Sequence, residues 1–312
     1  MKIFVTGGAG FIGSHLVDKL ISDGNAVTVY DDLSSGKKQF IEHLFEKNNF
    51  TFIKADLLDL EKLKKEIKDH EVVFHIAANP DVRLGAQKPE IAKKDIIASY
   101  NLLDSMREND VKKIVFSSSS TIYGETPPFP LSEDYGPLLP ISVYGAAKLA
   151  VEGLISSFCH TFNMQGWLFR FANVVGERGT HGVIVDFINK LRKNPKELEI
   201  LGDGKQRKPY LYVEDCVDAI LFGYKNADEQ INVFNLGCDT ATEVTKIAEI
   251  VVEEMGLTDV KFSYTGGKRG WKGDVPQFQF DISKMKKLGW NASFTSDEAV
   301  RKTVRILLNT NL

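Results

Sequence analysis

The sequence predicts an α/β protein: a doubly wound parallel sheet with helices on both faces, followed by a smaller C-terminal α/β region. Two observations lead to this fold class. In the first half of the 312-residue chain, apolar β-rich runs alternate with stretches in which apolar residues recur at helical spacing. That alternation is typical of parallel strands joined by helices. After residue 173 it weakens, and the connecting segments become rich in glycine and charge.

The elements of the first half are expected in a regular order. Strands are expected at 2–6, 26–32, 50–56, 72–78 and 112–120, and helices at 11–24, 58–70, 96–109 and 145–162. Each strand is a short apolar run, and each helix carries its apolar residues on one face.

The second half is expected to cover the mouth of this sheet. Three loops rich in glycine and charge, at 176–182, 202–209 and 266–276, suit that position, and a last helix is expected at 296–309. Segments 166–172 and 231–237 are expected to rejoin the first sheet as strands. We therefore divide the chain into residues 1–173 and residues 174–312, with the segment near 231–237 returning to the first part.

Composition excludes several classes of partner. Hydrophobic residues make up 43% and charged residues 26%, and the net charge is −3 without a basic stretch, so nucleic acid and membrane surfaces are not expected as partners. The apolar run Ile3–Val5 is too short for a signal peptide, and no window reaches the length of a membrane span. Cys159, Cys216 and Cys238 are far apart and odd in number. They suggest buried thiols in a reducing cytoplasm, with no disulfide framework and no metal site.

A glycine motif follows the first expected strand and opens the first helix. In Thr6–Gly13 the glycines stand at positions 7, 10 and 13. Gly7 allows a tight turn, Gly10 lets the backbone approach a pyrophosphate, and Gly13 lets helix and strand pack closely. This context predicts a dinucleotide site of the Rossmann type in residues 1–173.

The end of the second strand indicates which dinucleotide binds. Asp31 can accept hydrogen bonds from an adenosine ribose, and its charge would repel a 2′-phosphate. NAD is therefore expected rather than NADP. Asp56 and Leu57, after the third strand, are candidates to hold the adenine. Ala77, Ala78 and Asn79, after the fourth, are small enough to let the dinucleotide pass.

Tyr144 and Lys148 are the candidate catalytic pair. A spacing of four places them on one face of a helix. A nearby ammonium and a positive nicotinamide ring would both favour the phenolate, which lets a tyrosine act as a base. Four serines, Ser117 to Ser120, end the fifth strand, where hydroxyls suit a reacting alcohol better than they suit a core.

Together these motifs resemble the extended short-chain dehydrogenase/reductase family, and most closely its UDP-glucose 4-epimerase branch. The similar segments occur in the family's order over nearly the whole chain: TGGAGFIG, DDLSSG, HIAANPDVR, SSSSTIYG, YGAAK, RFANVVG, GDGKQRKPYLYVED, NVFNLG and RGWKGDVP.

The resemblance implies a role for each matching residue. Tyr144 would be the base, Lys148 its partner and Ser119 the hydroxyl that bridges to the sugar. Further cofactor contacts are implied at Phe11, Ile12, Asp32, Ser35, Gly36 and Ser117. A UDP-sugar would contact Asn173, Arg207, Lys208, Arg269 and Phe278, and Phe278 resembles a gate residue near the C2 substituent that favours glucose and galactose.

The reaction implied by the resemblance is a 4-epimerisation of UDP-glucose and UDP-galactose. NAD would oxidise C4 to a 4-keto sugar, and the hydride would return to the opposite face. The alternatives are a 4,6-dehydratase, a UDP-N-acetylhexosamine epimerase, a decarboxylase, a simple dehydrogenase and a regulatory NAD-binding module. A dehydratase usually has Asp-Glu where Ser120-Thr121 stands here, and a regulatory module commonly lacks the tyrosine or lysine.

Two further points follow from the resemblance. Asp95 stands where many relatives have asparagine, and such an acid either alters cofactor contacts or faces solvent. The expected helices at 96–109 and 145–162 resemble the pair through which relatives form a four-helix-bundle homodimer, although the same spacing also fits packing on the sheet.

Overall fold

The structure is a computed structural model that describes residues 1–79, 82–125 and 130–310. Its largest element is a seven-stranded sheet in which all neighbours pair in parallel, in the order β11-β6-β5-β4-β1-β2-β3. The strands are β1 (Lys2–Thr6), β2 (Ala26–Asp31), β3 (Phe50–Lys54), β4 (Val72–His75), β5 (Lys113–Ser119), β6 (Gln165–Phe171) and β11 (Ile231–Leu236). The predicted fold class is confirmed.

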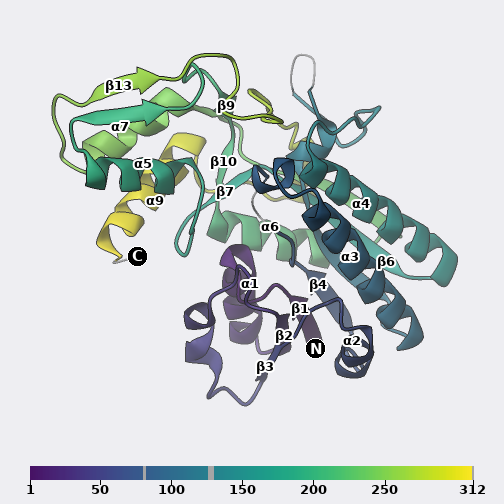
Figure 1. The fold of residues 1–312 in the computed structure, drawn as a ribbon. Helices are drawn as coiled ribbons and strands as arrows, with labels where there is room; N and C mark the ends of the chain where they lie inside the picture. The colour runs from purple at the N-terminus through teal and green to yellow at the C-terminus, as the bar shows by residue number, and fades with distance from the viewer. Residues whose placement is uncertain (80–81, 126–129, 311–312) are drawn as a thin grey trace.

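Helices cover both faces of this sheet, because its central strands bury apolar side chains on both sides. Along β1, Ile3 and Val5 belong to one core, whereas Phe4 belongs to the other. The first core includes residues of α1 (Phe11–Ser22), α6 (Val213–Asn226) and α8 (Ser283–Leu288), and the second includes residues of α2 (Leu60–Glu66), α3 (Glu90–Glu108) and α4 (Val143–Phe162). Figure 1 shows α3 and α4 side by side.

The strand order reverses between β1 and β4. From β1 the chain moves outward to β2 and β3, then crosses to β4 and continues through β5, β6 and β11. The loops after β1 and β4 therefore lead away from each other and leave a crevice at the carboxyl ends of the strands. The segments expected to rejoin the sheet supply β6 and β11, which pair with each other at its edge.

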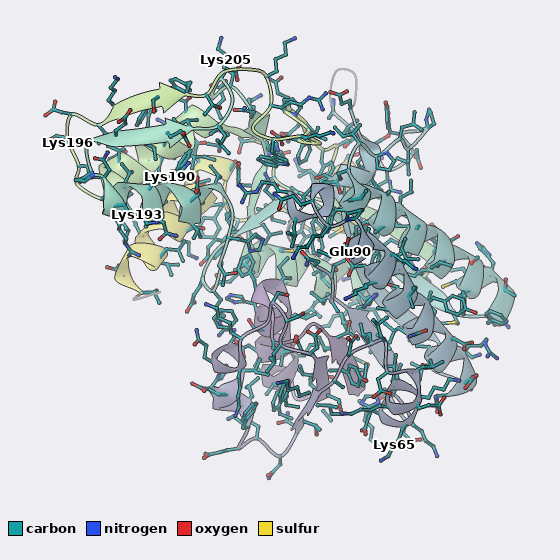
Figure 2. All side chains as sticks on the ribbon, viewed as in Figure 1. Lys65, Glu90, Lys190, Lys193, Lys196 and Lys205 are labelled. Atoms are coloured by element: carbon teal, nitrogen blue, oxygen red, sulfur yellow. The ribbon has the colours of Figure 1, made fainter. Side chains whose placement is uncertain are left out.

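Apart from β11, α6 and α8, most of the C-terminal half forms a smaller α/β layer (teal-green to yellow in Figure 1). Its core packs α5 (Val183–Lys193), α7 (Val244–Glu254) and α9 (Ser296–Asn309) against the parallel pair β8 (Glu197–Ile200) and β13 (Lys261–Tyr264). Two shorter pairs complete it: β7 (Asn173–Val175) with β10 (Tyr210–Tyr212), and β9 (Arg207–Lys208) with β12 (Thr242–Glu243). Figure 2 labels four lysines of this layer: Lys190 and Lys193 on α5, and Lys196 and Lys205 in the segments that follow it.

Two expectations from composition can be compared with the structure. Cys159, Cys216 and Cys238 are all buried and free. Among the described residues, no helix is long and apolar enough to cross a membrane.

A buried ion pair ties the edge of the sheet to α4. The guanidinium of Arg170, on β6, donates to both carboxylate oxygens of Glu152, at 3.1 and 2.9 Å. Its third nitrogen donates to the hydroxyl of Tyr123 at 2.8 Å and to the carbonyl of Glu133 at 2.9 Å. Both charged side chains are only 7% exposed. Since every charge here is paired, the cluster fixes the segment after β5 against β6 and α4.

Replacing Glu152 with glutamine is therefore expected to lower the free energy of unfolding by about 2 kcal/mol, because the Arg170 charge loses its counter-ion while it stays buried. Urea denaturation of the variant measures the change. Glu253→Gln breaks an ion pair whose carboxylate is 65% exposed, and because water screens that pair it should lower the free energy of unfolding much less than Glu152→Gln. Equal losses in the two variants would contradict this reading of the Arg170 cluster.

Candidate active site

A cavity of about 740 Å³ opens at the carboxyl ends of the central strands. Its walls include the loops that follow β1 to β6, the first turn of α4, and loops of the smaller α/β layer. It therefore spans the reversal of strand order and continues to the C-terminal half, as expected of a ligand site in such a sheet.

The glycine motif forms the floor of the cavity next to β1. Gly7 has φ +70°, and a Cβ atom there would lie 2.6 Å from the backbone nitrogen of Ala77. A Cβ atom on Gly13 would lie 2.1 Å from the carbonyl oxygen of Gly7. Only glycine fits at either position. Gly10 is the N-cap of α1, so the free amides of the first turn point toward the space that a pyrophosphate would need.

Asp31 and the segment after it form the next part of the wall. The carboxylate of Asp31 is only 7% exposed and accepts the N–H groups of Ala9 at 2.9 Å and Leu33 at 2.8 Å. Burial raises the pKa of Asp31, and these two hydrogen bonds act in the opposite direction. The carboxylate is thus fixed in the cavity by the backbone. Other predicted cofactor contacts that line this part are Phe11, Ile12, Asp32, Ser35 and Gly36.

The residues after β3 and β4 also line the cavity where they were expected. They are Asp56, Leu57, Ala77, Ala78 and Asn79. Asp56 is held by its own turn, because its carboxylate accepts the N–H of Leu58 at 2.9 Å.

A chain of hydrogen bonds behind the cavity joins β1, β4 and α3. The hydroxyl of Ser99 donates to the carbonyl of Asp95 at 2.7 Å, so Ser99 must accept from Nε2 of His75, 2.9 Å away. Nδ1 of His75 then accepts from the hydroxyl of Thr6 at 2.7 Å. Burial lowers the pKa of His75 to about 3. His75 is therefore neutral, and it aligns three elements around the site.

Tyr144 and Ser119 face the middle of the cavity. Tyr144 lies in the first turn of α4, whose N-cap Ser142 accepts the N–H of Gly145 at 3.0 Å. Burial raises the pKa of Tyr144, the charge of Asp95 raises it further, and a hydrogen bond with Ser119 lowers it. The Ser119 oxygen also accepts the N–H and the hydroxyl of Thr121 at 3.2 and 3.0 Å. The two predicted hydroxyls are thus brought together.

Lys148 lies behind Tyr144 and is 5% exposed. Its ammonium donates to the carbonyl of Ser117 at 2.6 Å and lies 5.8 Å from the centre of the Tyr144 ring. Burial lowers the pKa of Lys148 to about 8, and the charges of Asp95 and Glu152 oppose that shift. A cation close to the phenol stabilises the phenolate.

The serines at the end of β5 differ from expectation in one position. Ser117, predicted to contact the cofactor, is not among the lining residues, and its hydroxyl donates to the carbonyl of His75 at 3.3 Å. Ser118, Ser119 and Ser120 line the cavity. The buried Ser118 oxygen has no partner within the part of the chain that the structure describes.

The predicted substrate residues divide into two groups. Asn173, Lys208 and Phe278 line the cavity. The ammonium of Lys208 pairs with Asp274 at 2.5 Å and lies 5.2 Å from the centre of the Trp271 ring. Phe278 also packs in a buried aromatic cluster with Tyr123 and Phe280.

The structure does not bring Arg207 and Arg269 into the cavity wall with the other predicted substrate contacts. Neither lines the cavity, and both are exposed. Arg207 lies on β9 beside Lys208, where adjacent side chains point in opposite directions. Arg269 instead forms an ion pair with Glu125.

Sequence reasoning missed several residues of the cavity wall. Trp271 and Gln206 line it, and each has a buried polar atom, the indole nitrogen and Oε1, that lacks a partner among the described residues. Arg83 also lines it and stacks over Trp271, 5.6 Å from the ring centre. With Ser118, three residues of the wall thus have a buried polar atom without a partner among the described residues.

Asp95 faces the cavity and not bulk solvent. It lines the wall, and its carboxylate accepts the N–H of Asn79 at 3.4 Å. Burial raises its pKa, while the Lys148 charge and this hydrogen bond lower it. Within the described ranges, no group of histidine, cysteine and acidic side chains could hold a metal ion.

Comparisons with known proteins agree with this geometry. A model of the NAD dependent epimerase/dehydratase family matches residues 3–237. The chain is 34% identical to a putative UDP-glucose 4-epimerase of Methanocaldococcus jannaschii, over 99% of both chains. Among solved structures it is similar to a UDP-galactose 4-epimerase, with 42% identity, a TM-score of 0.90 and full coverage of both chains. It is also similar to the UDP-glucose 4-epimerase of Thermotoga maritima with UDP-glucose, with 36% identity, a TM-score of 0.89 and 99% coverage of both chains.

Proposed function

Because this chain belongs to the NAD-dependent epimerase/dehydratase family, we propose that it is a UDP-glucose/UDP-galactose 4-epimerase. The chain is an NAD-dependent nucleotide-sugar-modifying enzyme. The observation that carries the finer proposal is the arrangement of Tyr144, Ser119 and Lys148 in the middle of one continuous cavity. On one side lies the glycine motif, and on the other lie Asn173 and Lys208.

The residues beside β1 and β2 fit NAD. The proposed contacts are the amides at the start of α1 for the pyrophosphate and the carboxylate of Asp31 for the adenosine ribose. Asp31 also disfavours the 2′-phosphate of NADP through charge repulsion. When bound, NAD supplies the hydride acceptor and donor of the reaction.

Tyr144 is the proposed base for the sugar hydroxyl. Ser119 pairs with its phenol and is positioned to hold the same hydroxyl, so both groups meet at one proton. Lys148 supplies the positive charge that the phenolate needs, and its anchor on the Ser117 carbonyl keeps it close to the ring. During the reverse transfer, Tyr144 returns the proton to the sugar oxygen.

The diphosphate end of the substrate is proposed to bind near Asn173 and Lys208. Cations and amide donors match a diphosphate, and Arg83 adds a further cation to this wall. Tight binding of the diphosphate there would let the 4-keto sugar rotate while the nucleotide stays bound. Phe278 is the proposed gate beside C2, where its bulk favours glucose and galactose over N-acetylated sugars.

The segment after β5 argues against a dehydratase. A 4,6-dehydratase removes water across C5 and C6, which requires an acid and a base at those carbons. Ser120 and Thr121 line the cavity at that place, and neither side chain titrates in the physiological range. Asp95, the acid whose charge acts on Tyr144, comes from α3 instead.

Incubation with UDP-galactose tests the proposal. The purified protein should form UDP-glucose without accumulating absorbance at the NADH band, with or without added NAD⁺. Stoichiometric NADH would indicate a dehydrogenase, and loss of water from the sugar would indicate a dehydratase. No conversion of UDP-galactose, together with turnover of UDP-N-acetylhexosamines, would overturn the proposed role of Phe278.

A homodimer is proposed through α3 and α4. These helices pack side by side, and α3 exposes Ile97 and Tyr100 by 41% and 48%. Two copies meeting through this face would bury both side chains in a four-helix bundle. Sedimentation velocity should give twice the monomer mass of 34.9 kDa, and Tyr100→Glu should shift the protein toward monomer.

A further inference from the structure

Asp95 is fixed at the same wall as the tyrosine–lysine pair. It lies near the N-terminal end of α3, the helix that packs against α4, and Figure 2 labels Glu90 at the start of α3. Its carboxylate accepts the N–H of Asn79, and its carbonyl accepts the hydroxyl of Ser99, the last member of the chain through His75. Both ends of the residue are therefore held, and the side chain lines the cavity with Tyr144.

Lys148 is the buried cation on which the charge of Asp95 acts. Asp95 and Glu152 are the carboxylates whose fields act on buried Lys148, and Glu152 is already bound by Arg170 through two hydrogen bonds. Among the described residues, Asp95 forms no ion pair. From the other elements, His75 on β4 is neutral, and Lys64 on α2 pairs with Glu108 at the far end of α3. Arg83 and Lys94 line the cavity as further cations.

We propose that Asp95 is a positioning residue for the proton exchanged at Tyr144. Its carboxylate, held at the cavity wall that it shares with Tyr144, supplies the counter-charge for the Lys148 ammonium and thereby controls how Tyr144 gives up and regains its proton. The catalytic meaning of this inference rests on the proposed function, whereas the electrostatic relation among the three side chains does not.

The physical reason is that a negative charge favours the protonated form of every nearby group. It raises the pKa of Tyr144 and opposes the effect of burial on Lys148. Replacing Asp95 with asparagine removes the charge and retains an oxygen for the Asn79 N–H. The pKa values of Tyr144 and Lys148 should then both fall. The pH range in which Tyr144 and Lys148 can exchange a proton should therefore move down by about one pH unit.

A titration of Tyr144 in the NAD-loaded protein tests this without turnover. The tyrosinate absorbance is followed against pH in the wild type and in Asp95→Asn, and the matching Tyr144→Phe background is subtracted from each. We expect the Tyr144 signal of Asp95→Asn to appear about one pH unit lower. The pH profile of kcat/KM for UDP-galactose should move in the same direction.

Three further variants make the outcome decisive. Asp95→Glu keeps the charge and should titrate like the wild type, and Asp95→Ser supplies a second neutral side chain if the asparagine variant does not fold. Asp104→Asn removes a carboxylate from the opposite end of α3, where it pairs with Arg107, and should change nothing. An unchanged Tyr144 titration in the neutral variants overturns the inference. A shifted titration without turnover of UDP-galactose supports it and overturns the proposed function instead.

Discussion

Replacing Tyr144 with phenylalanine should lower kcat for UDP-galactose by about a thousandfold, within the range known for loss of a general acid–base. The phenyl ring still fills the first turn of α4 beside Lys148, so the cavity keeps its shape. What disappears is the oxygen that pairs with Ser119 and takes the substrate proton. The KM for UDP-galactose and the amount of NAD bound should stay close to the wild-type values. Steady-state kinetics and the NAD content of the purified variant measure these quantities.

A second tyrosine on the neighbouring helix provides the matched control. Tyr100 is 48% exposed on α3 and does not line the cavity, so Tyr100→Phe removes a hydroxyl outside the site and should leave kcat unchanged. If Tyr144→Phe retained a tenth or more of the activity with NAD fully bound, Tyr144 would not be the base, and another group would have to take the proton.

Replacing Gly13 with alanine should weaken NAD binding by at least about a hundredfold, the size of effect expected when a binding loop moves by about 1 Å. The new Cβ atom would lie 2.1 Å from the carbonyl oxygen of Gly7 and 2.9 Å from Cα of Gly8. Both obstacles are backbone atoms, so no side chain can turn aside, and the glycine motif must separate from α1. The amides at the start of α1 then no longer face the pyrophosphate. Isothermal titration of NAD⁺ into cofactor-free protein measures the change.

Gly153 is the matched control for this substitution. It lies in α4, it is exposed, and a Cβ atom there would meet nothing within 4 Å. Gly153→Ala should leave NAD affinity unchanged and stabilise the helix by up to about 1 kcal/mol. Unchanged NAD binding by a folded Gly13→Ala protein would mean that the pyrophosphate does not lie against this motif.

The parts of the site that sequence predicts are those set by local structure. In a parallel sheet the residues after neighbouring strands meet at one edge. Recognising β1 to β5 was therefore enough to group Gly7, Asp31, Ala77 and Ser119. The spacing of Tyr144 and Lys148 also predicted their proximity correctly, because both residues lie on one helix and local geometry sets their distance.

Sequence predicts least where the facing of a strand residue decides whether it lines the cavity. Arg207 and Lys208 are neighbours on the two-residue strand β9, and only Lys208 faces the cavity. Because side chains alternate, a one-residue difference in register exchanges an inward residue for an outward one. A motif shared with other proteins does not fix that register by itself.

Other residues of the cavity wall could not be predicted because they come from segments that are distant in the sequence and meet only in the folded protein. Trp271 lies close to Arg83 and Lys208, which come from segments far apart in the sequence. Asp95 lines the same cavity as Tyr144 because α3 packs on α4. By contrast, the helices of the C-terminal half do have a sequence pattern that could have predicted them. In α5 the buried residues Ile184, Phe187, Ile188 and Leu191 follow helical spacing, and the glycine-rich loops around them hid that pattern.

The most direct test of the proposed epimerase is the fate of the hydrogen on C4 of the sugar. UDP-galactose carrying deuterium at C4 is incubated with the NAD-loaded protein in ordinary water, and the UDP-glucose formed is analysed by NMR. Transient oxidation at C4 with return of the same hydride predicts that the deuterium stays on C4 of UDP-glucose. Deuterium lost to the solvent, or found in released NADH, would contradict it.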